Sequence, residues 1–294
     1  MKNVVITGTS NGLGYLTALT LAEKGFKVWA TMRDPLGKNL SKKEEFENIV
    51  KRENLNIKVI ALDVTDDNSV KFAFEKILLE DKKIDILINN AGSMFVGITE
   101  AYSIEQAKNQ FETNFFGTLR TIKAATPFMR EAKDGLIINI SSLAGRLAFP
   151  YFGIYSASKH ALEAYSESLG YELAPFGVEV TIIEPGAFGT GLLFSGPKEA
   201  DTNVFNEYGE HKDVPQKMLE NFKGFFETKD ALDPQLVADT IFKLIETKKG
   251  HREKRIVSGF DYGVIEYNEK VAPIQEFLVK DILQMSHLLK VNLN

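Results

Sequence analysis

A tyrosine and a lysine at helical spacing are the residues of this sequence best suited to acid–base chemistry. Tyr155 and Lys159 open a stretch with helical periodicity, and residues four apart share a helix face, so the phenol and the ammonium point the same way. A free tyrosine has a pKa near roughly 10 and is a poor base at neutral pH. A cation a few ångströms away shifts such a pKa by about 1–3 units towards the phenolate. We therefore expect Lys159 to lower the pKa of Tyr155, so that the phenol donates a proton to a nascent alkoxide or accepts one in the reverse direction.

Further polar residues stand where predicted strands end. Ser142 follows a strand that ends at Ile140, thirteen residues before Tyr155, and the segment Asn89-Asn90-Ala91-Gly92 closes another strand. Ligands of parallel sheets bind in the crevice at the carboxyl ends of the strands, which is where these groups are expected. Asn114 falls inside an apolar helical stretch, and a buried amide must find partners. Its side chain either serves the site or caps local backbone.

A glycine-rich loop joins the first predicted strand to the first predicted helix. The segment Thr7–Gly14 reads TGTSNGLG, and its glycines permit a tight turn and close approach of the backbone to a pyrophosphate. The helix that follows offers free N–H groups and the positive end of its dipole. A plain glycine-rich turn is the alternative, but the order strand, loop, helix favours a dinucleotide site formed by Gly8, Ser10, Asn11, Gly12, Leu13 and Gly14.

The end of the second predicted strand bears on the choice of cofactor. An NAD enzyme usually carries an acidic residue there to bind the ribose 2′-hydroxyl, whereas this chain has Met32 followed by Arg33. A guanidinium binds a 2′-phosphate bidentately, so we expect NADP(H) to be preferred over NAD(H). Arg33 as a solvated loop residue is the alternative, and Asp34 would weaken the preference if it paired with Arg33.

Short apolar runs alternate with longer segments of helical period throughout the chain. The predicted strands are Val4–Thr7, Lys27–Met32, Ile57–Leu62, Ile84–Asn89, Leu136–Ile140, Val178–Glu184 and Arg255–Val257. The predicted helices are Gly12–Lys24, Lys42–Asn54, Ser69–Leu79, Ser103–Met129, Tyr155–Ala174, Pro234–Thr247 and roughly Tyr267–Leu289. This alternation predicts an α/β, doubly wound (Rossmann-type) parallel sheet of about seven strands with helices on both faces. No repeat or low-complexity linker interrupts it, which predicts a single domain over residues 1–294.

Composition excludes several other classes of protein. The net charge is −5 with no basic stripe, which argues against a nucleic-acid partner. No apolar run reaches the roughly 18 residues of a membrane span, and the N-terminus lacks a signal-peptide pattern. Cysteine is absent, and the four histidines show no metal-ligand spacing. We therefore expect a cytoplasmic, metal-free protein with a small-molecule partner.

The stretch 190–228 is unusually long for a connection between regular elements. Such a length is typical of a functional lid, and its many phenylalanine, leucine and methionine side chains suit a lipophilic substrate. The alternative is that these residues pack as a small satellite core or a subunit contact.

Taken together, these motifs resemble the short-chain dehydrogenase/reductase family, in the branch with TGxxxGxG and YxxxK motifs. The resemblance covers roughly residues 1–190. It implies that Asp63 and Val64 contact the adenine and that Pro185, Gly186 and Thr190 line the nicotinamide carboxamide. Phe188 is expected to bind the cofactor as well. The segments 30–34 and 184–188, the latter ending at Phe188, more weakly resemble the steroid- and retinol-dehydrogenase-like enzymes.

The resemblance also implies a mechanism and an assembly. Asn114, Ser142, Tyr155 and Lys159 form a catalytic tetrad in which Ser142 and Tyr155 bind the substrate oxygen, and Lys159 also holds the nicotinamide ribose. Asn114 fixes a water that links Lys159 to solvent. In similar proteins the helical stretches that correspond to Ser103–Met129 and Tyr155–Ala174 pack across a two-fold axis, which predicts a homodimer or homotetramer.

The sequence therefore predicts an NADP(H)-dependent oxidoreductase that transfers hydride between the nicotinamide and a carbonyl or secondary alcohol of a lipophilic substrate. Two other functions stay open. One is a dinucleotide-sensing protein without catalysis, which a broken tetrad would favour. The other is a nucleotide-sugar epimerase or dehydratase on the same fold, for which TGxxGxxG spacing would be expected; this loop has one more residue before its second glycine.

Overall fold

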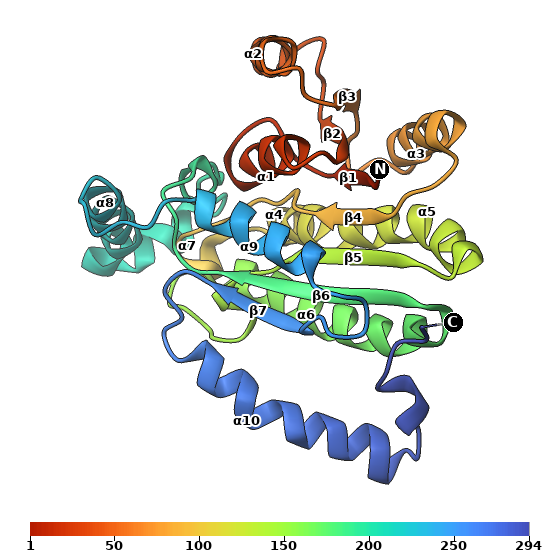
Figure 1. Ribbon diagram of the computed structural model, residues 1–294. Helices are drawn as coiled ribbons and strands as arrows, with labels where there is room; N and C mark the ends of the chain where they lie inside the picture. Colours follow the sequence, from red (N-terminus) through yellow and green to blue (C-terminus); the bar gives the residue numbers. More distant parts are fainter. Residues whose placement is uncertain (294) are drawn as a thin grey trace.

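The computed structural model describes residues 1–293, and a single parallel sheet forms its centre. Seven strands lie in the order β3-β2-β1-β4-β5-β6-β7 (Figure 1). They are β1 (Asn3–Ile6), β2 (Lys27–Met32), β3 (Ile57–Ala61), β4 (Ile86–Asn89), β5 (Gly135–Ile140), β6 (Val178–Pro185) and β7 (Arg255–Ser258). The predicted number of strands and the doubly wound topology are confirmed, with strand ends that differ from prediction by at most two residues.

Alternation of apolar side chains along the strands builds two cores, one on each face of the sheet. In β1, Val4 and Ile6 belong to the first core and Val5 to the second, as the two-residue period of a strand requires. The first core is covered by α1 (Gly12–Glu23), α2 (Leu40–Arg52) and α9 (Gln235–Glu246), and the second by α3 (Asp67–Asp81), α5 (Gly117–Ala132) and α6 (Gly153–Leu173). Both faces are therefore buried, which explains why the strands read as continuous apolar runs.

The helical regions depart from prediction in three places. The stretch predicted as one helix over Ser103–Met129 is α4 (Ile104–Phe111) and α5, joined by a five-residue π-helical turn, η2 (Glu112–Phe116). The stretch 190–228 contains two helices, α7 (Thr202–Glu207) and α8 (Val214–Phe226). The C-terminal helix α10 (Val264–Phe277) begins earlier than predicted and gives way to short turns. The short turns of the chain are η1 (Thr99–Ala101), η3 (Leu143–Gly145), η4 (Ala174–Phe176), η5 (Gly191–Phe194), η6 (Gly209–Asp213), η7 (Leu278–Ile282) and η8 (Ser286–Leu288).

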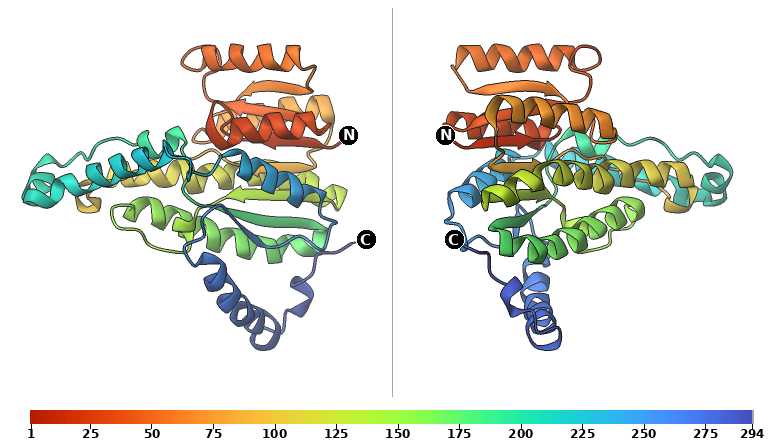
Figure 2. Two further views of the ribbon diagram at one scale, coloured as in Figure 1. Left: turned by 60° about the vertical axis from the view of Figure 1, so that its left-hand side comes forward. Right: turned by 90° about the vertical axis from the view of Figure 1, so that its right-hand side faces the viewer.

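The chain reverses its direction of travel across the sheet beside β1. It runs outward through β2 and β3 and then returns to place β4 on the other side of β1, and such a switch point leaves a crevice at the carboxyl ends of the strands. In Figure 1 the arrowheads of β4, β6 and β7 point towards the side on which α7 and α8 lie. Figure 2 shows these two helices projecting beyond that edge of the sheet. Among the described residues, no helix combines the length and apolarity needed to cross a membrane.

Candidate active site

The glycine loop between β1 and α1 forms a cradle that tolerates no side chains at two of its glycines. Gly8 has φ +70°, and a Cβ there would stand 2.9 Å from Ala91 Cα. A Cβ on Gly14 would lie 2.3 Å from Asn90 Nδ2 and 2.4 Å from the Gly8 carbonyl oxygen. No side chain caps the N-terminus of α1 at Asn11, so its first N–H groups are available to an anion. The predicted residues at this loop therefore fit a pyrophosphate.

Thr7, which the sequence analysis did not assign to the site, joins the glycine loop to the end of β4. Its hydroxyl accepts hydrogen bonds from the backbone N–H groups of Asn90 and Ala91, both at 2.9 Å. In return, Asn90 Nδ2 donates to the carbonyl oxygens of Thr7 and Gly8, both at 2.9 Å. The signal for this role was present: a hydroxyl directly after a buried apolar strand, next to the first glycine.

The turn after β6 forms the opposite wall. A Cβ on Gly12 would lie 3.7 Å from Thr190 Cβ, and a Cβ on Gly186 would stand 2.5 Å from the carbonyl oxygen of Phe260. Thr190 therefore faces the glycine loop directly. Pro185 ends strand β6, and Gly186 follows it. Phe188 differs from its neighbours, because its side chain is buried in the first core beside Gly259. The structure brings Thr190, but not the Phe188 side chain, to the predicted cofactor site.

Arg33 follows β2 with its side chain in solvent. It is exposed and forms no ion pair with Asp34, whose carboxylate instead accepts a hydrogen bond from the Lys38 backbone N–H at 2.7 Å. The N–H and the hydroxyl of Thr9 both donate to the Thr31 carbonyl, at 2.9 and 3.0 Å. This fastens the end of β2 to the glycine loop.

The two residues predicted at the adenine follow β3. Asp63 Oδ1 accepts hydrogen bonds from the backbone N–H and the hydroxyl of Thr65, at 2.9 and 2.7 Å. Val64 is buried, and a Cβ on Gly117 would come within 2.7 Å of its side chain. Both residues thus lie near the carboxyl edge of the sheet, beside the strand that precedes Arg33.

Tyr155 and Ser142 are brought together at the carboxyl edge. Ser142 follows β5 and its hydroxyl accepts a hydrogen bond from the Ala144 N–H at 3.1 Å, while Tyr155 lies in the first turns of α6 and is 3% exposed. Burial raises the pKa of Tyr155 to about 12, and a hydrogen bond with Ser142 opposes this effect. The phenol is therefore protonated at neutral pH and suited to donate a proton.

Lys159 lies on the same face of α6 as Tyr155, as predicted, but its ammonium is hydrogen-bonded to the backbone of β5 and not to the phenol. Nζ donates a hydrogen bond to the Ile140 carbonyl oxygen at 2.8 Å and lies 5.8 Å from the centroid of the Tyr155 ring. Burial lowers the pKa of Lys159 to about 8, and the charge of Glu163 opposes this effect. The expectation that the pKa of Tyr155 is lowered was wrong for this structure, because burial of the phenol raises that pKa and Lys159 is not among the groups that oppose the rise.

Asn114 lies in the π-helical turn η2 and is buried. Its Oδ1 accepts a hydrogen bond from Ser93 N–H at 2.8 Å, and its Nδ2 donates to the Ser93 carbonyl and to Ser158 Oγ, both at 3.0 Å. The Ser158 hydroxyl donates to the Tyr155 carbonyl at 2.7 Å. Asn114 thus connects the loop after β4 to the helix turn that carries Tyr155, and π turns often occur at functional sites. Its backbone partner Ser93 is 21 residues away in the chain, so the amide does not cap local backbone; its role in the site stays a prediction.

A buried polar chain that the sequence analysis missed crosses the sheet beneath these residues. Thr121 Oγ1 donates to Asn89 Oδ1 at 2.6 Å, Asn89 Nδ2 donates to Asn139 Oδ1 at 2.8 Å, and Asn139 Nδ2 donates to Ser166 Oγ at 2.8 Å. It joins α5, β4, β5 and α6 through four side chains. A fully bonded buried chain of this kind specifies one arrangement of helices against strands.

A buried cluster of charges lies one helical turn beyond Lys159. Glu163 Oε2 accepts a hydrogen bond from Arg255 Nε at 3.0 Å, and Glu184 Oε2 accepts one from Asn268 Nδ2 at 2.6 Å. Burial raises the pKa of both carboxyl groups, to about 7 for Glu184, where the charge of Glu163 raises it further. The cluster ties the catalytic helix α6 to α10, a tertiary contact without a local sequence signal.

Apolar side chains pack around Tyr155 and form an apolar wall. Tyr155, Phe152 and Ala144 form a separate buried cluster. The partly buried side chains packed against it come from several segments, including the stretch 190–228: Met94, Val96, Phe149, Leu193, Met218 and Phe222. A substrate that reaches Tyr155 therefore meets mainly apolar atoms.

Comparison with known proteins identifies the family. The sequence profile described as short chain dehydrogenase matches residues 2–200, and the chain belongs to this family. A 3-ketodihydrosphingosine reductase of Bacteroides thetaiotaomicron is 37% identical over 246 residues, which cover 83% of this chain and 84% of that protein. Human retinol dehydrogenase 8 is 39% identical over 189 residues, 63% of this chain and 58% of that protein.

Solved structures agree with the family assignment. A short-chain dehydrogenase from Streptomyces avermitilis superposes with a TM-score of 0.73 at 30% identity, covering 96% of this chain and 97% of that one. Two more distant structures share the fold. An alcohol dehydrogenase of the archaeon Thermococcus sibiricus, complexed with 5-hydroxy-NADP, has a TM-score of 0.70 at 24% identity and covers 89% of this chain and 97% of that one. A short-chain dehydrogenase/reductase of Burkholderia phymatum, in complex with NAD, has a TM-score of 0.75 at 22% identity and covers 93% of this chain and 95% of that one. The chain is thus an oxidoreductase that acts on CH–OH groups and transfers hydride with a nicotinamide dinucleotide.

Proposed function

We propose that this protein is an NADP(H)-preferring oxidoreductase that interconverts a ketone and a secondary alcohol on a lipophilic substrate. The observation that carries the proposal is the Tyr155 hydroxyl, hydrogen-bonded to Ser142 and set in an apolar wall at the carboxyl edge of the sheet. The described residues 1–293 then form one domain, with residues 190–228 as a lid over the site; residue 294 of the predicted domain lies outside the described residues.

The residues of the cofactor cradle would hold the dinucleotide in sections. The N–H groups at the start of α1 and the loop residues from Gly8 to Gly14 bind the pyrophosphate. Asp63 and Val64 contact the adenine, with Arg33 at the 2′-phosphate. Asn90, Ala91 and Gly92, together with Pro185, Gly186 and Thr190, line the nicotinamide half. When bound, NADP(H) supplies or accepts the hydride.

The tetrad residues would then handle the proton and the developing charge. Ser142 and Tyr155 donate hydrogen bonds to the substrate oxygen, and Tyr155 transfers its phenolic proton as the alkoxide forms. Lys159 holds the ribose and supplies positive charge near the phenol. Asn114 fixes the backbone of Tyr155 through Ser158. In the oxidative direction the Tyr155 phenolate accepts the proton from the alcohol.

The lid supports the choice of a lipophilic substrate. Leu193 of η5 and both Met218 and Phe222 of α8 pack against the cluster that contains Tyr155. Apolar walls with few polar groups are typical of sites for hydrophobic ligands. The names of two relatives, a 3-ketodihydrosphingosine reductase and a retinol dehydrogenase, support the same class of substrate.

A substrate panel tests the proposed substrate class. NADPH oxidation is followed at constant enzyme with long-chain 3-keto lipids, sterol ketones, retinal, short ketones and sugars. We expect the highest kcat/KM for a lipophilic ketone or aldehyde, and we expect Phe222→Ser to lower kcat/KM for that substrate more than for a short ketone. Higher kcat/KM for sugars, or an equal loss for both substrates in Phe222→Ser, would contradict the apolar site.

Arg33 tests the proposed cofactor preference. Its guanidinium forms no hydrogen bond or ion pair within the part of the chain that the structure describes, so nothing competes with a 2′-phosphate. A charge-assisted hydrogen bond is worth about 1.5–3 kcal/mol, and solvent screening at an exposed residue favours the lower value. We therefore expect Arg33→Ala to reduce the preference for NADPH over NADH by about tenfold.

Lys38→Ala is the matched control, since it removes one exposed positive charge from the same turn. It should leave the preference within about twofold of wild type. Equal kcat/KM for the two cofactors in the wild-type enzyme would refute the preference. A strong preference that survives Arg33→Ala would show that another residue reads the phosphate.

A further inference from the structure

A cavity of about 360 Å³ lies at the amino ends of β6 and β7, at the edge of the sheet opposite to Tyr155. Its floor is the first half of β6, from Val178 to Ile182, and one wall is the last half of α6 with η4. The segment 250–255, which leads into β7, forms another wall. The C-terminal segment from Leu288 to Leu293 closes the remaining side. No residue of the proposed reaction lines this cavity.

The C-terminal segment is fastened beside the cavity rather than through it. The backbone N–H of Asn292 donates to the Ala174 carbonyl at 2.8 Å, and its Nδ2 donates to the Pro175 carbonyl at 3.2 Å. These bonds hold the segment at the end of α6, and the apolar side chains of Leu289 and Val291 line the space that remains. The cavity is therefore a feature of the folded chain and is bounded largely by apolar atoms.

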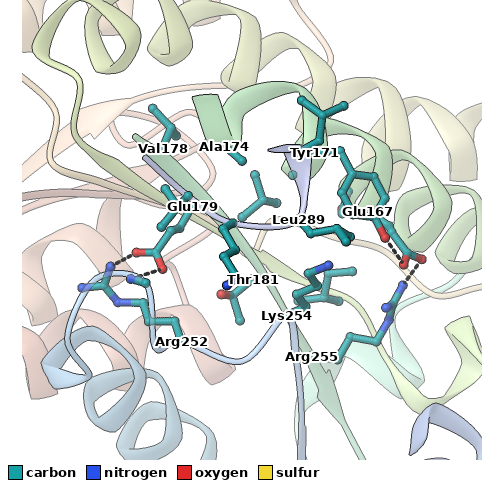
Figure 3. Close-up of a pocket in the computed structure, with 18 of the residues that line it drawn as sticks. Glu167, Tyr171, Ala174, Val178, Glu179, Thr181, Arg252, Lys254, Arg255 and Leu289 are labelled. Atoms are coloured by element: carbon teal, nitrogen blue, oxygen red, sulfur yellow. Dashed lines mark hydrogen bonds and ion pairs between the residues drawn. The ribbon is translucent and has the colours of Figure 1, made fainter. Parts of the chain in front are cut away.

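Two buried ion pairs account for most of the charge on the walls. Arg252 pairs with Glu179, and both side chains are at most 10% exposed. Arg255 Nη2 donates to Glu167 Oε2 at 2.8 Å. In Figure 3 these pairs lie on opposite sides of the cavity. Neither pair has a charge left over for a ligand.

Lys254 lies between the two ion pairs (Figure 3) and, unlike their members, has no carboxylate partner among residues 1–293. Its Nζ forms no hydrogen bond and no ion pair with any residue from 1 to 293, and it lies 4.6 Å from the centroid of the Tyr171 ring. Lys254 is exposed to solvent. Desolvation of the ammonium lowers the pKa of Lys254, and the charges of Glu167 and Glu276 oppose this effect. Lys254 therefore offers its ammonium donors beside an apolar cavity. A ligand that complements this arrangement has an anionic head, which pairs with the ammonium, and an apolar body, which fills the cavity.

We propose that this cavity binds a small amphipathic carboxylate, whose head pairs with Lys254 and whose apolar body fills the space between β6, α6 and the C-terminal segment. At about 30 Å³ for each water-sized group, the volume holds roughly a dozen non-hydrogen atoms. Decanoate has this size and is the probe. The cavity is independent of the proposed substrate site, and it shares with it only the helix α6 and the strand β6.

Calorimetric titration of the full chain with decanoate tests the proposal. Three variants locate the binding. Lys254→Met removes the cation and keeps an apolar stem. Lys248→Met is its matched control, because both lysines are exposed and Lys248 lies outside the cavity. Gly170→Leu fills the cavity: a Cβ on Gly170 points towards Val180, 3.7 Å from its Cβ, with no closer atom. Leucine is a better helix former than glycine, so this variant should fold; its melting curve and NADPH binding check that it does.

We expect wild type and Lys248→Met to bind decanoate with equal affinity. Lys254→Met should weaken binding by at least about tenfold, the loss of one charge-assisted hydrogen bond, and Gly170→Leu should abolish it. Decan-1-ol, which lacks the carboxylate, should bind wild type at least about tenfold more weakly than decanoate. The proposal is overturned by absence of binding to wild type, by binding that Lys254→Met and Gly170→Leu leave unchanged (which places decanoate at another site), or by equal affinities for the acid and the alcohol.

Discussion

Replacing Thr7 by valine should destabilise the protein far more than the same replacement at Thr9. Both threonines are at most 1% exposed, and valine matches threonine in shape, so the difference comes from hydrogen bonds. In Thr7→Val the N–H groups of Asn90 and Ala91 lose their acceptor. In Thr9→Val the Thr31 carbonyl loses one donor but keeps the Thr9 N–H at 2.9 Å.

The magnitudes follow from these counts. An N–H left without a partner costs about 1–3 kcal/mol, and because Asn90 and Ala91 are only partly buried, water can replace part of the loss. We expect Thr7→Val to lower the free energy of unfolding by about 2–4 kcal/mol. Thr9→Val, which loses one ordinary hydrogen bond, should lower it by about 1 kcal/mol.

Urea unfolding with linear extrapolation measures both values. Because Asn90 and Ala91 stand against the glycine loop, Thr7→Val should also weaken NADPH binding by about tenfold, whereas Thr9→Val should change it less. Equal losses of stability in the two variants, within about 0.5 kcal/mol, would refute the reasoning that orphaned N–H groups dominate. A large loss of stability with unchanged NADPH affinity would show that the loop keeps its shape without this link.

Three further predictions concern the reaction and the assembly. Tyr155→Phe should abolish turnover and leave cofactor affinity nearly unchanged, because only the chemical step uses the phenolic proton; more than about a tenth of wild-type kcat would exclude Tyr155 as the acid. Lys159→Met should weaken cofactor binding and lower kcat. Because burial lowers the pKa of Lys159 to about 8, the folded state disfavours its charged form, and this penalty is present at pH 7 and disappears as pH rises through 8 towards the ordinary value. The gain in stability of Lys159→Met over wild type should therefore be larger at pH 7 than at pH 10, by up to about 3 kcal/mol, and a difference that does not change with pH would contradict the lowered pKa. Finally, light scattering should show a homodimer or homotetramer, since Ile104 of α4, Phe116 of η2 and Phe128 of α5 are 74%, 44% and 39% exposed; a monomer at micromolar concentration would rule this out.

The exposed face of α4 and α5 stays uncovered by the C-terminal segment. Instead, α10 follows the edge strand β7, and the turn η8 returns to η4 at the end of α6 (Figure 1). The side chain of Arg146 contacts two residues of α10. Its Nε donates a hydrogen bond to Asn268 Oδ1 at 2.8 Å, and its guanidinium carbon lies 4.8 Å from the centroid of the Tyr267 ring. Helix α10 thus supports the loop after Ser142, and α4 and α5 remain available for a second subunit.

The sequence alone determined the elements and the residues with a local signature. The seven strands could be located because each is an apolar run bounded by turn residues, and a strand buried on both faces needs nothing else. The glycine loop, Ser142, Tyr155 and Lys159 could be located because their spacing along the chain already fixes which helix face or strand end they occupy. The five-residue turn η2 around Asn114 escaped prediction because it differs from an α-helix only in its hydrogen-bond register.

The tertiary structure decided what each of those residues meets. In the folded chain the Phe188 side chain is buried in the first core. The Asp34 carboxylate accepts a hydrogen bond from a backbone N–H and does not pair with Arg33. Asn114 bonds to Ser93 and Ser158. The tertiary structure also reversed the expected direction of the Tyr155 pKa, since burial raises it. Local spacing reports which groups share a face, whereas desolvation and hydrogen bonding depend on segments that are distant in the chain and adjacent only after folding.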